Sequence, residues 1–378
     1  MASIYIHIPF CQSRCIYCDF YSTTDIARQE QYVECLEREM LLRKNEWPQH
    51  ARTLSIYIGG GTPSTLPFTF LQRILKKVVQ LFPIADDAEV TVEANPDDVT
   101  EEWASHLTET CVNRISMGVQ TFHDTTLRML RRRHSSDQAR KAVQILKDAG
   151  YKNISIDLIY GLPGQTLEMW ENDISEALKL QVPHISAYSL MYEEGTPLTQ
   201  MLQKGIVEEM SDELSWRCYE TLCTRLREAG YEHYEISNFA LPGMYSRHNS
   251  AYWTGDPYLG FGAGAHSYDG QQTRRSNNGD LRAYLQCLSQ EEGDCFYEIE
   301  HLSPRDLYNE FVMTRLRTSK GFNMEDILAR FGTKAYEYCM QMAQPHLLQG
   351  NLKRVKKQIC LTKEGIFISN DVISDLFI

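Results

Sequence analysis

The chain has 378 residues, of which 43% are hydrophobic and 23% are charged, a composition typical of a folded globular protein. Its formal net charge of −12 argues against non-specific nucleic-acid binding as the main task, because such binding requires a positive surface. No stretch approaches the ~18 apolar residues of a membrane-spanning helix, and the N-terminus does not resemble a signal peptide, so we expect a cytoplasmic protein.

The first predicted strand, at residues 4–8, leads into three closely spaced cysteines. Cys11, Cys15 and Cys18 form the pattern C-x3-C-x2-C. Three thiolates at this spacing can hold a four-iron cluster and leave its fourth iron open to a small molecule. The alternative is a structural zinc site, but zinc normally takes four ligands, and no second C-x2-C or histidine pair completes such a set. The pattern therefore favours a [4Fe-4S] cluster.

Strand-like and helix-like segments alternate over about the first 230 residues. Further strands are predicted at 54–58, 89–93, 114–117, 154–159 and 184–189, with helices at 31–44, 68–81, 101–109, 136–149 and 167–179. Repeated strand–helix units indicate a parallel sheet, either doubly wound or closed into an incomplete barrel. In both architectures ligands gather at the C-terminal ends of the strands, where the three cysteines would lie.

Glycines and acidic residues occur near the ends of these predicted strands. The second strand is followed by Gly59-Gly60-Gly61-Thr62-Pro63, whose glycines allow the backbone to approach a ligand closely. Glu93 ends the third strand, and Asp157 interrupts the apolar fifth strand, where a buried carboxylate needs a partner. Taken singly, the glycines are also typical of an ordinary turn and Glu93 of an exposed strand end. Together they predict one pocket for a cofactor with a sugar, an adenine and an amino acid.

The rest of the chain changes character. A helix at 211–229 precedes an irregular, glycine-rich and aromatic stretch at 231–279, and further helices are predicted at 304–317, 324–331 and 335–349, followed by a hairpin at 352–361. The basic run at 353–357 could contact nucleic acid or anionic lipid, but the pattern favours a solvated turn. We expect a core barrel at 1–235, a connecting region at 236–300 and a winged-helix-like C-terminal domain at 301–378.

The motifs C-x3-C-x2-C-D-F, G-G-G-T-P, E-x-N-P, G-V-Q-x-F and D-L-I-Y-G-L-P resemble those of the oxygen-independent coproporphyrinogen III oxidase (HemN-like) family of radical SAM proteins, over nearly the whole chain. The resemblance implies an α/β fold, with an incomplete (βα)6 radical SAM barrel and a mostly helical C-terminal domain. It implies that Cys11, Cys15 and Cys18 hold the [4Fe-4S] cluster. The positions that match contacts to cluster-bound S-adenosyl-L-methionine (SAM) are Tyr5, Gly60 and Glu93, and those around a second SAM are Gly61, Thr62, Gln120, Arg132 and Asp157.

Two features separate the chain from the oxidases of this family. Phe20 stands where the oxidases have a fourth cysteine. Cys11 also lies only ten residues after Met1, whereas the oxidases carry a longer N-terminal segment that helps to close the active site around a reactive radical. Both features count against oxidase activity on coproporphyrinogen.

The segment Arg247-His248-Asn249-Ser250-Ala251-Tyr252-Trp253 resembles the H-N-x-x-Y-W signature of a heme-chaperone branch of the family. A neutral imidazole can ligate heme iron, and flanking aromatic rings offer a flat apolar surface to a porphyrin. On its own the segment also fits a histidine packed among aromatics in a loop. The resemblance implies His248 as the axial heme ligand, with His266 as a second candidate contact to heme or SAM.

The sequence thus predicts a heme chaperone that binds a [4Fe-4S] cluster, SAM and heme. The resemblance implies transfer of heme to respiratory-chain hemoproteins at the inner face of a membrane, which leaves room for peripheral membrane contact and for a homodimer. The alternatives are the oxidase itself and a radical SAM methyltransferase, which would also explain a second SAM site.

Overall fold

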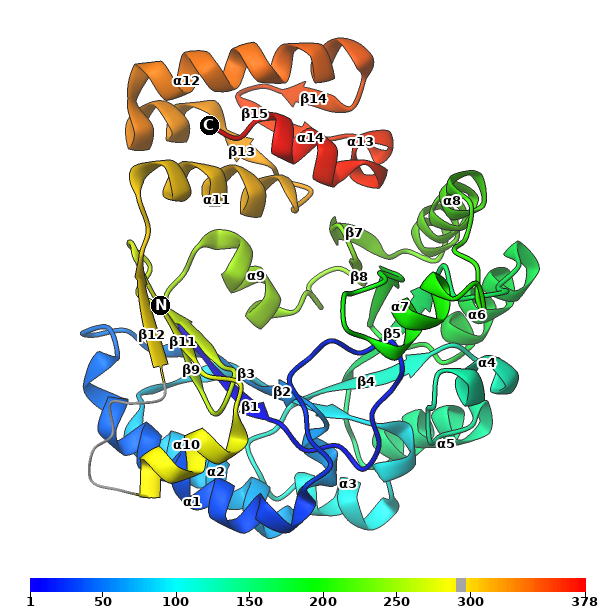
Figure 1. Cartoon of the computed structure of the whole chain (residues 1–378), viewed down its shortest axis with the longest axis vertical. Helices are drawn as coiled ribbons and strands as arrows, with labels where there is room; N and C mark the ends of the chain where they lie inside the picture. The colour runs from blue at the N-terminus through cyan, green and yellow to red at the C-terminus, as the bar shows by residue number, and fades with distance from the viewer. Residues whose placement is uncertain (290–296) are drawn as a thin grey trace.

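The computed structural model describes residues 1–289 and 297–378, and its centre is a sheet of six parallel strands with helices on the outer side (Figure 1). The strands are β1 (Ala2–Ile8), β2 (Thr53–Gly60), β3 (Ile84–Ala94), β4 (Arg114–Gln120), β5 (Asn153–Tyr160) and β6 (His184–Ser189). The helices that follow them are α1 (Gln29–Arg43), α2 (Phe68–Leu81), α3 (Glu101–Leu107), α4 (Asp124–Met129), α5 (Ser136–Asp148), α6 (Leu167–Lys179), α7 (Pro197–Gln203) and α8 (Asp212–Glu228). The strands pair in sequential order, without the reversal of a doubly wound sheet, which confirms the predicted incomplete barrel.

The two faces of this sheet differ in polarity because side chains alternate along each strand. In β1, Ile4, Ile6 and Ile8 are fully buried in the core formed with the outer helices. The intervening residues Tyr5 and His7 point to the inner face. The neighbouring strands continue this alternation in register, so the barrel interior is lined by polar side chains such as Ser55, Tyr57, Glu93, Ser116, Asp157 and Ser186. The interior is therefore built to surround a polar ligand.

Residues 231–279 extend the sheet at both edges, so the prediction of an irregular stretch is wrong. On one side β8 (Asn238–Ala240) pairs with β6 and then with β7 (Glu232–Glu235). On the other side β9 (Tyr258–Phe261) runs parallel to β1 and is followed by β10 (His266–Tyr268), β11 (Thr273–Asn277) and β12 (Tyr297–His301). These strands have three to five residues, too few to show an alternating pattern in sequence. The two that join the barrel, β8 and β9, pair with strands distant in the chain.

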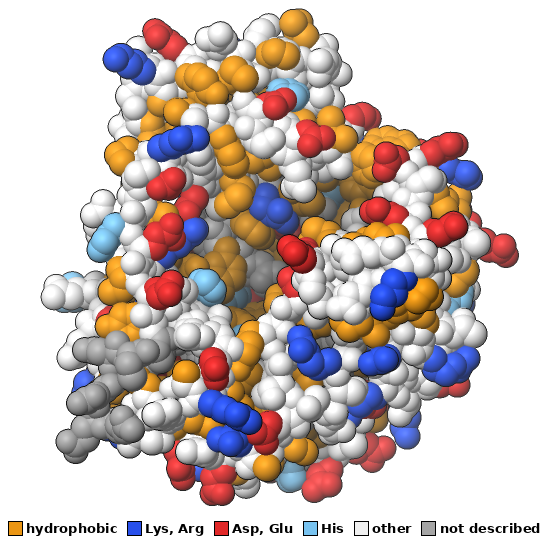
Figure 2. Space-filling view, viewed as in Figure 1, with side chains coloured by type: hydrophobic (Ala, Val, Ile, Leu, Met, Phe, Trp, Pro, Cys, Tyr) orange, Lys and Arg blue, Asp and Glu red, His pale blue; other side chains and the backbone are white. Residues whose placement is uncertain are grey.

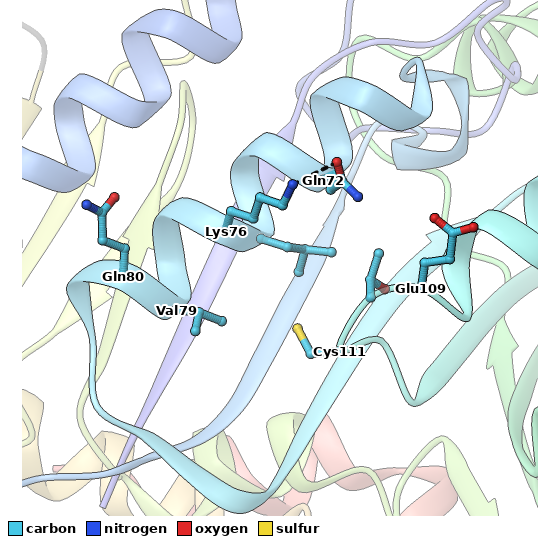
Figure 3. Close-up of a pocket in the computed structure, with 8 residues that line it drawn as sticks. Gln72, Lys76, Val79, Gln80, Glu109 and Cys111 are labelled. Carbon is cyan, nitrogen blue, oxygen red and sulfur yellow. Dashed lines mark hydrogen bonds between the residues drawn. The ribbon is translucent and has the colours of Figure 1, made fainter.

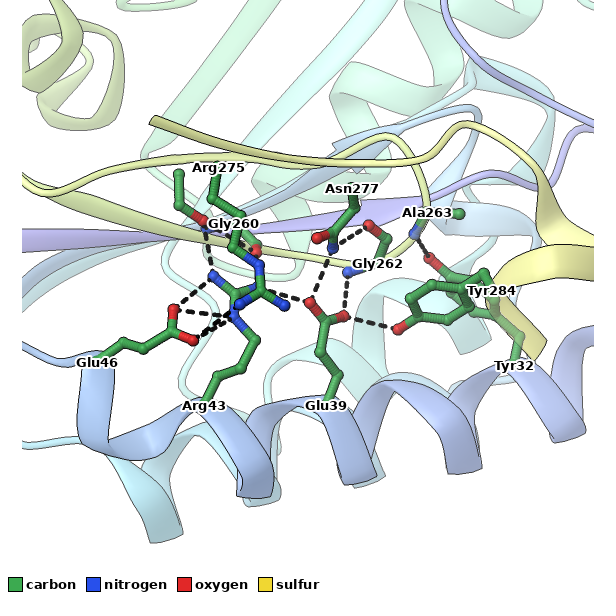
Figure 4. Close-up of polar contacts among 11 residues, drawn as sticks. Tyr32, Glu39, Arg43, Glu46, Gly260, Gly262, Ala263, Arg275, Asn277 and Tyr284 are labelled. Carbon is green, nitrogen blue, oxygen red and sulfur yellow. Dashed lines mark hydrogen bonds and ion pairs between the residues drawn. The ribbon is translucent and has the colours of Figure 1, made fainter. Parts of the chain in front are cut away.

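A buried ion pair fastens α1 to these added strands (Figure 4). The Glu39 carboxylate has no exposed surface and accepts hydrogen bonds from Arg43 Nη1 at 2.6 Å, the Gly262 amide at 2.7 Å, and Asn277 Nδ2 and Tyr284 Oη at 2.8 Å. Arg43 in turn donates to the Gly260 carbonyl at 2.7 Å. Four donors on two oxygens satisfy the carboxylate, as a buried charge requires. The network links α1, β9, β11 and α10 (Leu281–Ser289).

The C-terminal region has a hydrophobic core of its own and stacks on one side of the barrel (Figure 1). It contains α11 (Pro304–Leu316), β13 (Phe322–Asn323), α12 (Met324–Gln349), β14 (Leu352–Val355), β15 (Gln358–Leu361), α13 (Lys363–Phe367) and α14 (Ser369–Asp375). Gly332 interrupts α12 with φ of 83° and ψ of 178°, which matches the break between the two helices predicted there. The predicted hairpin is β14–β15, and its basic run at 353–357 is exposed, as expected for a solvated turn.

Helix α9 (Arg247–Thr254) lies between the barrel and α11 (Figure 1). Ser246 caps its N-terminus: the Ser246 side chain accepts a hydrogen bond from the Asn249 amide and so satisfies one of the free N–H groups of the first turn. The histidine–tyrosine motif therefore lies on a helix and not in a loop. Within residues 1–289 and 297–378, no helix has the length and hydropathy needed to cross a membrane.

Candidate cofactor-binding site

A cavity of about 510 Å³ opens at the C-terminal ends of β2 to β6, beside the cysteine loop that follows β1. It is the place where ligands bind in parallel α/β sheets. Every predicted site residue except Tyr5, His248 and the second heme candidate His266 lines it. These residues are Cys11, Cys15, Cys18, Gly60, Gly61, Thr62, Glu93, Gln120, Arg132 and Asp157. The fold thus brings together side chains from five consecutive strand–helix units.

The cysteine loop is held against the barrel by its neighbours. The Cys11 amide donates to the Thr23 carbonyl at 2.9 Å, and Cys11 Sγ is hydrogen-bonded to Thr62 Oγ1 at 3.3 Å. Arg132 Nη1 donates to Cys15 Sγ at 3.5 Å and places a positive charge beside the thiol. Burial raises the pKa of the Cys18 thiol to about 11, so a bound metal would have to displace its proton.

The donor set of this loop fits an iron–sulfur cluster. Three cysteine thiols line one cavity next to the guanidinium of Arg132, and soft sulfur ligands are those that clusters use. Among the described residues, no three His, Cys, Asp or Glu side chains gather around a single ion position. A cluster distributes its thiolates over several iron atoms, so its ligands need not share one centre.

Two glycines let the end of β2 lie against this loop. Gly60 has φ of +111°, a conformation that side chains rarely adopt, and a Cβ there would lie 2.6 Å from the His7 ring. A Cβ on Gly61 would lie 3.0 Å from Cys11 Sγ. The Gly60 amide donates to Glu93 Oε2 at 3.1 Å. The glycine loop therefore forms a cradle that any larger residue would fill, as expected for close approach of a ligand.

Replacing Gly60 with alanine should lower the free energy of unfolding by about 1–3 kcal/mol more than an ordinary surface substitution does. Alanine is strained at this φ, and its Cβ would also collide with the His7 ring. Gly150→Ala is the matched control, since Gly150 has φ of +95° and a Cβ there meets nothing within 4 Å. Chemical denaturation of both variants measures the difference. Equal losses of stability in the two variants would show that the His7 contact costs nothing.

Two partly buried carboxylates face the cavity from inside the barrel. Glu93 Oε1 accepts a hydrogen bond from Tyr57 Oη at 2.7 Å. Burial raises the pKa of Glu93 to about 7 and that of Asp157 to about 6. The protein itself therefore stabilises the ionised forms of both acids poorly. A ligand that brings a positive charge or hydroxyl donors would stabilise their ionised forms.

Gln120 and Arg132 occupy one wall through an irregularity in β4. The register to β5 shifts between Gly118 and Gln120, and Gln120 has φ of +69°. Arg132 Nη2 donates to Asn95 Oδ1 and to the Gly118 carbonyl, both at 2.6 Å, while its buried Nε has no partner among the described residues. A strained glutamine and an orphaned guanidinium N–H are features of a binding site more than of a packed core.

Sequence reasoning missed several residues of this cavity. Tyr57, Asn95 and Arg114 line it, and none was predicted as a site residue. The motif E-x-N-P does contain Asn95, so the signal was present there. For Tyr57 the alternation along β2 could have placed it on the inner face with Glu93, because both positions fall on the polar side of their strands.

Tyr5 and His248 lie deeper in the barrel, below the cavity. The rings of Tyr57 and His248 stack at 4.9 Å, and the Tyr5 ring lies 6.3 Å from that of His248. Ser55 Oγ donates to Ser3 Oγ at 2.8 Å, which leaves it to accept from His248 Nδ1 at 2.9 Å. His248 Nε2 then accepts from Tyr252 Oη at 2.9 Å.

His248 is therefore a neutral, buried imidazole with both nitrogens hydrogen-bonded. It is 1% exposed, and burial lowers its pKa to about 3. The nitrogen available to a metal is Nε2, and Tyr252 occupies it. The second candidate, His266, is exposed on β10 and does not line the cavity.

Another, more open cavity of about 370 Å³ lies between α2 and the turn that follows α3 (Figure 3). It is lined by Gln72, Lys76, Val79 and Cys111, among others, and by none of the predicted site residues. Cys111 is exposed there as a free thiol.

Comparison with known proteins identifies the two parts of the chain. The model of the radical SAM superfamily matches residues 5–177, and that of the HemN C-terminal domain matches residues 302–368. The structure of the coproporphyrinogen III oxidase HemN from Escherichia coli superposes with a TM-score of 0.85 at 23% identity, covering 100% of this chain and 90% of that one. This likeness confirms the predicted fold.

Similarity to curated relatives extends over almost the entire sequence. The heme chaperone HemW of Lactococcus lactis is 36% identical over 371 residues, covering 98% of this chain and 96% of that protein. The heme chaperone HemW of Bacillus subtilis is 35% identical over 376 residues, covering 98% of both chains. The radical SAM family implies a [4Fe-4S] cluster and SAM, for which the cavity has suitable residues. The chain therefore belongs to the HemW heme chaperone family of radical SAM proteins.

Proposed function

We propose that this protein is a heme chaperone that carries a [4Fe-4S] cluster, binds SAM and heme, and transfers heme to heme-requiring respiratory proteins. The observation that carries the proposal is similarity over nearly the full length to proteins named heme chaperone HemW. Phe20 supports it, because this residue replaces the fourth cysteine of the oxidases and is 64% exposed.

Different residues of the cavity would bind the cluster and SAM. Cys11, Cys15 and Cys18 would hold the cluster, which supplies redox chemistry and an iron open to SAM. Glu93 and the glycine cradle would bind one polar end of SAM, since a carboxylate that faces the cavity suits a charged amine. Asp157 and Arg132 offer an acceptor and a donor on the opposite wall. Each role is a proposal that rests on placement in the same cavity.

Heme ligation by His248 requires one change in the structure. Tyr252 Oη must leave Nε2, because this bond uses the lone pair that would coordinate iron. Ser55 can keep its bond to Nδ1 and hold the ring in the tautomer that a metal needs. In the structure as it stands, the Tyr252 hydroxyl therefore blocks the nitrogen that would coordinate iron.

Replacing His248 with alanine should weaken heme binding by about tenfold or more, because a coordinate bond is lost. The measurement is a hemin titration of the anaerobically reconstituted protein, followed by absorbance. Tyr252→Phe should bind heme at least as tightly as the unchanged protein, since it frees Nε2 and keeps the aromatic ring. The cluster absorbance should be unchanged in both variants.

His184→Ala is the matched control. His184 is equally buried and lies in the same kind of relay, with Ser155 Oγ at 2.7 Å and Tyr234 Oη at 2.8 Å, but it lies outside the motif that contains His248 and Tyr252. Equal heme affinity in the His248 and His184 variants would remove His248 as the ligand. No saturable heme binding in the unchanged protein would contradict the proposed function and favour the oxidase or methyltransferase alternatives, which product analysis with SAM would separate.

A further inference from the structure

A second cavity of about 440 Å³ lies between the barrel and the C-terminal helices. Helix α9 and strands β9 and β10 form one side, and α11 and α12 form the other (Figure 1). Figure 2 shows the molecule hollowed below the C-terminal helices, with hydrophobic side chains gathered around the hollow. The cleft is thus separate from the cofactor cavity at the strand ends, and the two have no lining residue in common.

Aromatic rings from both parts of the protein face this cleft. Tyr252 and Tyr258 come from the barrel side and meet edge to face at 4.7 Å. Phe311 and Phe331 come from the C-terminal side and meet at 5.6 Å. A cleft with aromatic walls on opposite sides suits a flat apolar ligand.

Arginines are placed at the same cleft. Arg274 is paired with Glu310 at 2.7 Å. Arg315 and Arg330 both lie over the Phe311 ring, at 5.6 Å and 5.3 Å from its centre, and neither has a carboxylate within 4 Å among the described residues. Arg315 Nη2 donates to the Thr254 carbonyl at 2.8 Å.

Two guanidinium groups on one ring repel each other. Burial and the charge of Arg330 lower the pKa of Arg315, with Asp326 and Asp256 opposing the effect from outside hydrogen-bonding range. The site therefore attracts an anion, and two guanidiniums can receive two carboxylates.

We propose that this cleft is the heme-binding site, in which the porphyrin lies between the aromatic walls and its two propionates bind Arg315 and Arg330. The inference rests on the proposed heme function and gives it a location. It also accounts for the heme motif, because Tyr252 and Trp253 line the cleft while His248 lies directly behind Tyr252. Movement of the Tyr252 side chain would open the cleft toward the imidazole.

The test compares hemin with its dimethyl ester, in which the propionates are uncharged. The unchanged protein should bind hemin about tenfold or more tightly than the ester, the factor expected from charge-assisted hydrogen bonds. Arg315→Gln and Arg330→Gln should each lose about tenfold in hemin affinity and lose none for the ester. Arg305→Gln is the control, because Arg305 is exposed on α11, the helix of Arg315, and does not line the cleft.

The possible outcomes separate the site from the function. Hemin affinity that depends on His248 but is the same in all three arginine variants would overturn the cleft and leave the chaperone function intact. Equal affinity of the unchanged protein for hemin and its ester would also overturn it. Absence of hemin binding altogether would overturn both proposals.

Discussion

Replacing Cys15 with alanine should abolish the broad visible absorbance of the anaerobically reconstituted protein. Cys15 lines the cofactor cavity between Cys11 and Cys18, and its Sγ accepts a hydrogen bond from Arg132. Without it only two thiolates remain in the loop, and two rarely hold a four-iron cluster. Bound iron and labile sulfide, measured with the absorbance, should fall close to background.

Cys111→Ala provides the control for this experiment. Cys111 is an exposed free thiol outside the cofactor cavity, so its loss should leave iron content and absorbance unchanged. A cluster that survives in the Cys15 variant at full iron content would contradict the assignment of the three cysteines. Loss of the cluster in the Cys111 variant would show that reconstitution depends on thiols in general.

Replacing Glu39 with glutamine should lower the free energy of unfolding by about 3–5 kcal/mol, the range measured when one member of a buried pair is removed. Glutamine has nearly the same shape, but one of its two terminal atoms is a donor, and it would face the donors that now bind the carboxylate. Arg43 would keep Glu46 as its partner and lose the buried charge beside it. Chemical denaturation followed by tryptophan fluorescence measures the change.

The matched substitution on the same helix is Glu37→Gln. Glu37 forms one ion pair with Arg73 at 2.7 Å near the surface, so its loss should cost about 1 kcal/mol or less. A Glu39 variant as stable as the Glu37 variant would show that the network of Figure 4 contributes little to stability.

The barrel could be predicted from sequence because its strands are long and its helices amphipathic. All six parallel strands lie where β-branched runs predicted them, and only their ends differ, as with β3, which begins at Ile84. The edge strands of residues 231–279 could not be predicted in the same way. They are three to five residues long. Gly260 in β9 is needed because a Cβ there would lie 2.0 Å from the His266 carbonyl oxygen, a contact that only the folded structure reveals.

The cofactor cavity could be predicted because its residues come in short motifs at strand ends. Other features depend on tertiary contacts that the sequence pattern does not show. Glu39 and Arg43 look like an exposed pair on a helix in sequence, yet they are buried because β9 to β11 cover that face of α1. Likewise, the spacing of His248 and Tyr252 fits a helix face, but only the fold shows that this face enters the barrel.

The most direct test of the account is heme transfer from the loaded protein to an acceptor. The heme-loaded protein is mixed with the apo form of a b-type respiratory hemoprotein and, separately, with apomyoglobin, which captures heme that has dissociated. A chaperone should give a transfer rate to the respiratory acceptor that rises with acceptor concentration and exceeds the rate of capture by apomyoglobin. Equal rates for the two acceptors, independent of their concentrations, would mean passive release and would contradict the proposed function.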